Sequence, residues 1–127
     1  MTENEIAKVV VDAALKVHRA LGPGLLESVY EIILAHELRS RGLKVQRQLS
    51  IPVRDENICF DEGFCADLVV EQKVIVEIKS LETVKRVHKK QVLTYLRLTD
   101  MRLGLLINFG TDLIRDGITR LVNALEE

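Results

Sequence analysis

Two carboxylates and one amine in the middle of the chain are of the right types to bind a divalent cation and to assist a reaction beside it. They are Asp67, Glu77 and Lys79. Mg²⁺ is typically bound by one or two carboxylates together with water and phosphate oxygens. A lysine amine next to such a cation would orient or deprotonate a water molecule, or stabilise charge on a phosphate. Whether the three side chains meet depends on the strands that carry them.

The segment that contains them predicts a β-hairpin, because two apolar runs rich in β-branched residues flank the polar triplet Glu71-Gln72-Lys73. With the triplet as the loop, the antiparallel register places Asp67 opposite Glu77. Side chains alternate between the two faces of a strand, so Lys79 shares the face of these acids. The other face is entirely apolar and carries Ala66, Leu68, Val70, Val74, Val76 and Ile78.

Two carboxylates placed opposite each other on a sheet have an electrostatic cost. Like charges across a strand pair repel, and desolvated carboxylates need a partner. A divalent cation held between Asp67 and Glu77 removes this conflict. The alternative is an exposed strand on which Glu77 forms ordinary ion pairs with Lys79 or Lys73. The hairpin sequence alone leaves both interpretations open.

Composition limits the class of protein. The chain has 127 residues, of which 47% are hydrophobic and 29% charged, and we expect one domain over residues 1–127. The net charge of −1 excludes a broadly basic nucleic-acid binder, so any nucleic-acid site must be a local patch. No apolar run approaches the ~20 residues of a membrane span. The acidic start lacks the basic region of a signal peptide, so we expect a cytoplasmic protein without a membrane partner.

Two amphipathic helices are predicted before the hairpin. The first covers residues 3–21, and Thr2 and Glu5 form a capping box at its start. A Gly-Pro-Gly breaker ends it, and the second helix follows over residues 25–41. Glu27 lies in the first turn of this second helix. It either interacts with the helix N-terminus or joins the acids of the hairpin.

A meander of antiparallel strands connects the second helix to the hairpin. Residues 43–53 alternate between apolar and polar, and Pro52 indicates either an edge strand or the end of a strand. We expect a turn at residues 55–57, a short strand at 58–60, and a break at 61–63 before the hairpin begins.

The helix expected after Lys79, which runs to about residue 98, carries the densest basic cluster. Its members are Lys85, Arg86, His88, Lys89, Lys90 and Arg97. Gln91 and Tyr95 lie one turn apart and share a face with His88. A neutral amide and a phenol beside a basic stripe suit contacts to nucleic acid. The alternative is a solvated basic face on which Tyr95 is a half-buried packing residue.

The end of the chain predicts a buried strand at residues 103–109, parallel to a neighbour because a helix precedes it. The tail, residues 111–127, is expected to form a short strand and a final helix. The assembled order is α-α-β-β-β-β-α-β, an α/β fold with a mixed central β-sheet flanked by helices.

The segment Gly24-Leu25-Leu26-Glu27-Ser28-Val29-Tyr30 has the pattern G-x-x-E-x-x-Y. Together with four further motifs, it makes the chain resemble the GxxExxY family of the PD-(D/E)XK nuclease-like superfamily. The resemblance covers nearly the whole chain. The other motifs are Ala66-Asp67, Glu77-Ile78-Lys79, Gln91-x-x-x-Tyr95 and Leu106-Ile107-Asn108-Phe109.

The resemblance implies a restriction-endonuclease-like core and a metal-dependent nuclease site. In such a site Asp67, Glu77 and the backbone carbonyl of Ile78 would ligate Mg²⁺ or Mn²⁺. Lys79 would be the catalytic lysine, and Glu27 a further acid with a role in catalysis or metal binding. The residues expected to support the site or the nucleic acid are Gln91, Tyr95, His88, Lys85, Lys89 and Tyr30. The chain departs from the superfamily pattern at Ala66, where a proline usually precedes the aspartate.

We therefore expect a metal-dependent nuclease that hydrolyses phosphodiester bonds of nucleic acid, DNA rather than RNA. The alternative is a nucleic-acid-binding or partner-binding module with a nuclease fold, whose hydrolysis is weak or depends on another subunit. The small size of the chain favours this alternative, since specific protein–DNA interfaces commonly bury ~1,000–2,500 Å² of protein surface. A homodimer would double the available surface. A purely structural domain is the third interpretation.

Overall fold

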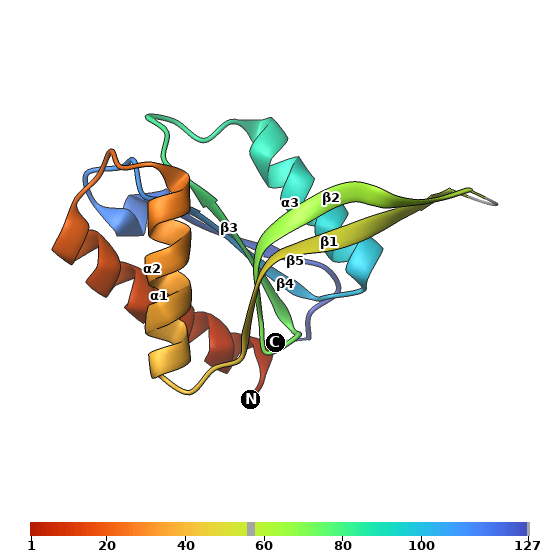
Figure 1. Cartoon of the computed structure of the whole chain (residues 1–127), viewed down its shortest axis with the longest axis horizontal. Coiled ribbons are helices and arrows are strands. Elements are labelled where there is room, and N and C mark those ends of the chain that lie inside the picture. Colours follow the sequence, from red (N-terminus) through yellow and green to blue (C-terminus); the bar gives the residue numbers. More distant parts are fainter. Residues whose placement is uncertain (56–57, 127) are drawn as a thin grey trace.

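One mixed β-sheet separates two layers of helices (Figure 1). The computed structural model describes the backbone of residues 1–55 and 58–126. Side chains are described for the same residues except 53–55 and 58–63. Helices α1 and α2 cover one face of the sheet, and α3 covers the other. The helices are α1 (Glu3–Leu21), α2 (Glu27–Ser40), α3 (Arg86–Thr99) and the 3₁₀ turn η1 (Ile114–Gly117). The strands are β1 (Val45–Asp55), β2 (Ile58–Val70), β3 (Val74–Lys79), β4 (Leu103–Asn108) and β5 (Ile118–Val122).

The strand order in space is the same as in sequence, β1-β2-β3-β4-β5. Every neighbouring pair is antiparallel except β3 and β4, which are parallel. A parallel pair needs a crossover connection, and α3 supplies it. The expected α/β architecture, with a mixed sheet flanked by helices, is therefore confirmed, as is the parallel placement of β4.

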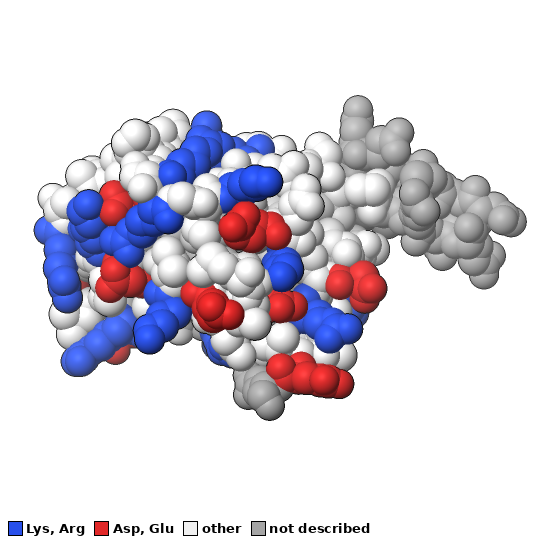
Figure 2. Space-filling view, turned by 90° about the horizontal axis from the view of Figure 1, so that it is seen from below, with Lys and Arg blue, Asp and Glu red and all other residues white. Residues whose placement is uncertain are grey.

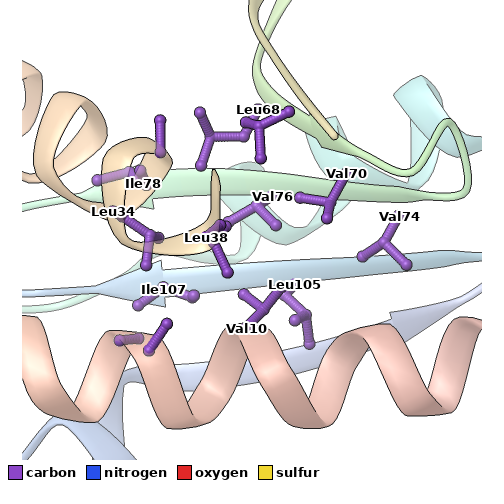
Figure 3. Packing of buried hydrophobic residues seen from close by; sticks show 14 of the residues in the cluster. Val10, Leu34, Leu38, Leu68, Val70, Val74, Val76, Ile78, Leu105 and Ile107 are labelled. Carbon is purple, nitrogen blue, oxygen red and sulfur yellow. The ribbon is translucent and has the colours of Figure 1, made fainter. Parts of the chain in front are cut away.

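The strands at the centre of the sheet are apolar because helices cover both faces. All of β4 is buried, and so is β3 up to its last residue, Lys79. On the α1/α2 face, Val10, Leu34 and Leu38 point from the helices toward the strand side chains (Figure 3). On the α3 face, Ile75 packs with Val92 and Leu96. Double-sided burial is what runs such as Val74–Val76 require.

The start of α1 has the geometry that its sequence predicts. The Thr2 side chain accepts a hydrogen bond from the Glu5 N–H at 3.2 Å, and Glu5 Oε1 accepts one from the Thr2 N–H at 3.1 Å. Both bonds satisfy N–H groups that the first turn of a helix leaves unpaired. No helix in the described part of the chain is long and apolar enough to cross a membrane.

The expected break at residues 61–63 is wrong, because β2 is continuous from Ile58 to Val70. The pairing with β1 shifts register instead, from Ile51–Phe64 to Val53–Phe60. Three residues of β2 thus lie opposite Pro52 alone, in a bulge that absorbs the extra residues without ending the strand. The expected turn at Glu56 and Asn57 lies outside the described residues.

The tail also differs from its prediction. The structure has η1 and then β5, where a short strand followed by a helix was expected. β5 pairs with the free edge of β4, with Ile118 opposite Ile107. Gly117 makes this return possible, because a Cβ there would lie 2.3 Å from the Asn108 carbonyl oxygen. The observed element order is therefore α-α-β-β-β-α-β-η-β.

Tyr30 ties the loop between α1 and α2 to the core. Its ring is fully buried and stacks on Phe109, with centroids 4.4 Å apart. Its hydroxyl donates a hydrogen bond to the Gly22 carbonyl and accepts one from the Leu25 N–H at 3.1 Å. Tyr30 thus fixes the chain where α2 begins, and its expected role in supporting the site stays a prediction.

We predict that Tyr30→Phe lowers the free energy of unfolding by about 1–2 kcal/mol, because it removes both hydroxyl hydrogen bonds and keeps the stacked ring. Urea denaturation followed by circular dichroism measures this change. Ser28→Ala, on the exposed side of the same helix, is the matched control and should change the value by less than about 0.5 kcal/mol. Equal stability of Tyr30→Phe and wild-type protein would contradict the anchoring role.

Candidate functional site

The candidate site lies where β2 and β3 stop pairing as a regular ladder. The register runs from Val70–Val74 to Leu68–Val76, as the sequence predicts. Beyond that point the two acids replace ladder bonds. Glu77 Oε1 accepts the Asp67 N–H at 3.0 Å, and Asp67 Oδ2 accepts the Ile78 N–H at 2.8 Å. Each carboxylate thus holds a backbone N–H of the opposite strand, and the two acids are brought together.

Ala66 lies on a different face from the one predicted. Strand alternation assigns it to the apolar face of Leu68 and Val70, but it packs under α3 with Val69 and Tyr95. The strict alternation is lost at the residue next to Asp67, where β2 separates from β3. The residue that replaces the usual proline is therefore fully buried.

Glu77 is an acid in an unfavourable environment. Its exposed fraction is only 4%, and its pKa is raised to about 8. Burial is the largest cause, and the negative charge of Asp67 and a hydrogen bond to the Asp67 carboxyl act in the same direction, whereas the Asp67 N–H and the positive charge of Lys79 lower the pKa. A buried carboxyl with a raised pKa is a candidate functional group.

A third acid, Glu31 of α2, joins the site, and the sequence analysis missed it. Its exposed fraction is 5%. Arg47 of β1 donates to Oε2 from two nitrogens, at 2.9 and 3.2 Å, and Gln48 donates to Oε1 at 2.5 Å. Burial raises the pKa of Glu31, the Arg47 hydrogen bonds oppose that shift, and the nearby charge of Asp67 adds to it.

The sequence does contain a signal for Glu31. It precedes Leu34 by three residues and Leu38 by seven, which is the spacing of the buried stripe of α2. An acid at a stripe position must find a buried partner. The sequence analysis considered Glu27 instead, one turn earlier.

The structure places Glu27 apart from this group. Its side chain is exposed in the first turn of α2 and lines a pocket of about 500 Å³ together with Leu25, Leu26 and Ser80. Ser80 directly follows Lys79, and its hydroxyl donates to the Leu25 carbonyl at 2.6 Å. Glu27 thus borders the end of β3, while Glu31 contacts the residues that surround Asp67.

Lys79 ends β3 beside the acids. It is half-buried, and its charge lowers the pKa of Glu77, which places the amine in the electrostatic reach of that carboxyl. The Lys79 carbonyl accepts the Phe109 N–H at 2.8 Å. Ile78 contributes its N–H to Asp67, and a role of its carbonyl as a metal ligand stays a prediction.

The pKa of the Cys65 thiol is affected by the acids of the candidate site. The Sγ atom donates to the Gln48 side-chain oxygen at 3.2 Å. Partial burial raises the pKa of the thiol, and so do the charges of Asp67, Glu77 and Glu31. The raised pKa of the thiol therefore reflects how close Cys65 lies to the acids of the candidate site.

The helix face predicted to carry His88, Gln91 and Tyr95 is partly buried and partly exposed. Tyr95 of α3 is buried in the core, with its ring centroid 5.1 Å from that of Phe64, and its role at the site stays a prediction. Burial and the charges of Glu77 and Asp67 raise its pKa to about 12. Gln91, one turn earlier, is half-buried.

The basic residues of this segment remain near the surface. His88 accepts the Lys85 N–H at 3.0 Å and so caps α3, while the Lys85 and Lys89 side chains are exposed. On the face seen from below, Lys and Arg side chains are interspersed with Asp and Glu, which agrees with the near-neutral net charge (Figure 2).

The donor set suits a hard cation that keeps other ligands. Asp67 and Glu77 offer carboxylate oxygens, and Glu77 is buried without a full countercharge in contact. Mg²⁺ commonly uses one or two protein carboxylates and fills its shell with water and phosphate oxygens. Among the described residues, no group of three or more His, Cys, Asp or Glu side chains is arranged to enclose a metal ion.

Comparison with known proteins supports one assignment. Residues 4–121 match the model of the PD-(D/E)XK nuclease superfamily. The matched region contains Asp67, Glu77 and Lys79, all of α2 and α3, and α1 except for its first residue, Glu3. Searches of curated proteins and of solved structures gave no match.

We predict that Glu77 makes the metal-free protein less stable as the pH rises. A carboxyl whose pKa is near 8 when folded and near 4.5 when unfolded binds its proton more tightly in the folded state. Its stabilising contribution is complete below about pH 4.5 and is lost as the pH rises through 8. Between pH 5 and pH 8 the loss is on the order of 3 kcal/mol.

Urea unfolding in EDTA at both pH values, for wild-type protein and Glu77→Gln, measures this effect. The amide keeps the acceptor for the Asp67 N–H and cannot ionise, so the variant should lack this part of the pH dependence. Identical pH profiles for the two proteins would show that Glu77 titrates normally.

Proposed function

The chain belongs to the PD-(D/E)XK nuclease superfamily, and from this membership we propose that it hydrolyses phosphodiester bonds of nucleic acid at Asp67 and Glu77. The observation that carries the proposal is the pair of carboxylates at the fork between β2 and β3. Glu77 is buried there beside Asp67, and each acid holds a backbone N–H of the other strand.

Asp67 and Glu77 would hold Mg²⁺ or Mn²⁺, with the Ile78 carbonyl as a further ligand. When bound, the cation would lower the pKa of water and neutralise charge on the phosphate. The support for a cation is that Glu77 is buried beside Asp67, where a second negative charge is unfavourable. Binding a divalent cation favours their ionised forms and removes their repulsion.

Lys79 would act on the substrate side of this pair. Its amine lies in the field of Glu77 at the end of β3, where the chain leaves the sheet. There it would contact a phosphate oxygen and stabilise the negative charge that develops during hydrolysis. It would also orient the water molecule that attacks the phosphorus atom.

Glu31 would be the acid that α2 contributes. Its hydrogen-bond network includes Gln48, which also contacts Asp67, so it belongs to the same group of side chains. Glu27 lies at the rim, in the pocket that includes Ser80. The two acids differ by one helical turn and give different expectations on mutation.

The substrate surface would include the start of α3. Lys85, Arg86, Lys89 and Lys90 are exposed there, in the segment that directly follows the Glu77–Lys79 strand. Exposed cations of this kind bind phosphates without reading sequence. We propose DNA rather than RNA as the substrate. A specific interface of ~1,000–2,500 Å² would use a large share of the 7631 Å² surface, so a second copy of the chain is a natural way to extend it.

We predict that Asp67→Asn and Glu77→Gln each lower Mn²⁺-dependent cleavage by more than about 10²-fold, beyond the ~10–100-fold cost of changing an outer-shell residue. Calorimetric titration with Mn²⁺ and incubation with single- and double-stranded DNA and RNA measure binding and cleavage. Glu71→Gln, in the β2–β3 turn at the far end of β3, is the matched acid control and should behave as wild type.

The outcomes separate the candidate functions. Loss of metal binding and cleavage in both site variants supports the nuclease. Metal binding by wild-type protein without cleavage of any substrate favours a binding module whose hydrolysis depends on another subunit. No Mn²⁺ binding by folded wild-type protein contradicts the proposed site.

We predict that Glu31→Gln lowers cleavage about 10–100-fold, the range for residues that orient metal ligands, and that it does so by more than Glu27→Gln. The reason is burial and contact, since Glu31 shares a hydrogen-bonding partner with Asp67 and Glu27 is exposed. Cleavage rates at saturating Mn²⁺ compare the two variants directly. A larger loss of cleavage for Glu27→Gln than for Glu31→Gln would contradict this prediction and assign the more important role to Glu27.

A further inference from the structure

We infer that Gln48 is a positioning residue of this site, which joins Glu31 of α2 to Asp67 of β2 through one side-chain amide. The inference rests on the proposed function, since the acids that Gln48 orients are those proposed to hold the cation and to assist it. Gln48 belongs to none of the motifs named above. It lies on β1, which the sequence predicts only as a strand.

The hydrogen bonds of Gln48 use every part of its amide. The nitrogen donates to Glu31 Oε1 at 2.5 Å and to Asp67 Oδ1 at 3.3 Å. The oxygen accepts from Cys65 Sγ at 3.2 Å. The two N–H groups of one nitrogen are thus divided between two acids from different elements. No other residue is seen to bond both of these carboxylates in the described part of the chain.

The backbone of Gln48 explains how an edge strand reaches the site. Its φ is +52°, the left-handed region that residues other than glycine rarely adopt. The register passes from Arg47–Leu68 to Leu49–Ala66, and the intervening residues are Gln48 and Asp67. β1 therefore leaves strand geometry at the one residue opposite Asp67. Unfavourable backbone conformations of this kind are found preferentially at functional sites.

The chemistry of an amide suits this position. Asp67 Oδ2 is already fixed by the Ile78 N–H, and the Gln48 contact to Oδ1 fixes the carboxylate from the other side. A neutral donor orients the acid without contributing a charge that would oppose a divalent cation. Arg47, the adjacent residue, carries the countercharge but bonds only to Glu31. Arg47 thus compensates the charge of Glu31, and the adjacent Gln48 orients Asp67.

The competing explanation is that Gln48 merely occupies a bend in β1. The two explanations differ for glycine and asparagine, which both adopt positive φ more readily than glutamine. If the bend alone matters, Gln48→Gly and Gln48→Asn should be as good as wild type or better. If the bridge matters, both should fail, because glycine has no amide and the asparagine amide is one methylene too short.

The experiment is calorimetric titration with Mn²⁺ of wild-type protein, Gln48→Gly, Gln48→Asn and the control Gln46→Asn. Gln46 is exposed two residues earlier on the same strand and makes no bridge to these acids. We expect the Kd for Mn²⁺ to rise about 10–100-fold in both Gln48 variants, as for other residues that orient metal ligands, and to stay unchanged in the control. Thermal unfolding of each metal-free variant verifies that it is folded.

A second readout tests the bridge itself. If Gln48 acts through Glu31 and Asp67, the effects of Gln48→Gly and Glu31→Gln on the Mn²⁺ affinity should not add in the double variant. Wild-type affinity in folded Gln48→Gly and Gln48→Asn, or full additivity with Glu31→Gln, would overturn the inference and leave the proposed function intact. Failure of wild-type protein to bind Mn²⁺ would overturn the proposed function, and the inference with it.

Discussion

The candidate site depends on two hydrogen bonds, in which the Glu77 carboxylate accepts the Asp67 N–H and the Asp67 carboxylate accepts the Ile78 N–H. In a regular ladder these N–H groups would bond to carbonyls of the opposite strand. Here each bonds to a carboxylate instead. The strands stay connected, and the buried Glu77 is held beside Asp67.

Three elements next to the fork between β2 and β3 contribute contacts to the candidate site. α2 supplies Glu31, and β1 supplies both the countercharge of Arg47 and the bridging amide of Gln48. β4 pairs with the other edge of β3 as far as Lys79. The candidate site therefore combines residues from four elements, α2, β1, β2 and β3, that are far apart in the sequence. Its geometry is a property of the packed sheet and helices together.

Two anchors outside the acidic group fix the segments that border it. Tyr30 holds the loop that leads into α2, through its stack on Phe109 and its two hydroxyl hydrogen bonds. Asn108 holds the chain after Lys79, since its side chain accepts the Leu81 N–H and donates to the Leu81 carbonyl, both at 2.9 Å. Motif residues of this kind contribute to function by placing backbone, and their burial explains why they must be specific side chains.

The sequence by itself determined the features that depend on neighbours along the chain. These were the capping box of α1, the register of the β2–β3 hairpin, the parallel placement of β4 and hence the meeting of Asp67 and Glu77. Periodicity and turn chemistry act over a few residues, so they can be read without a structure. The superfamily follows from the same motifs.

Only the tertiary structure decided which acid of α2 is buried next to the residues around Asp67, and which side chains bond to it. Glu27 and Glu31 differ by one turn, and the docking of α2 on the sheet buries one and exposes the other. The left-handed backbone of Gln48, the bulge opposite Pro52 and the pairing of β5 likewise arise from contacts between distant segments. Local propensity carries no record of such contacts, because the free energy that stabilises them comes from packing and from buried hydrogen bonds.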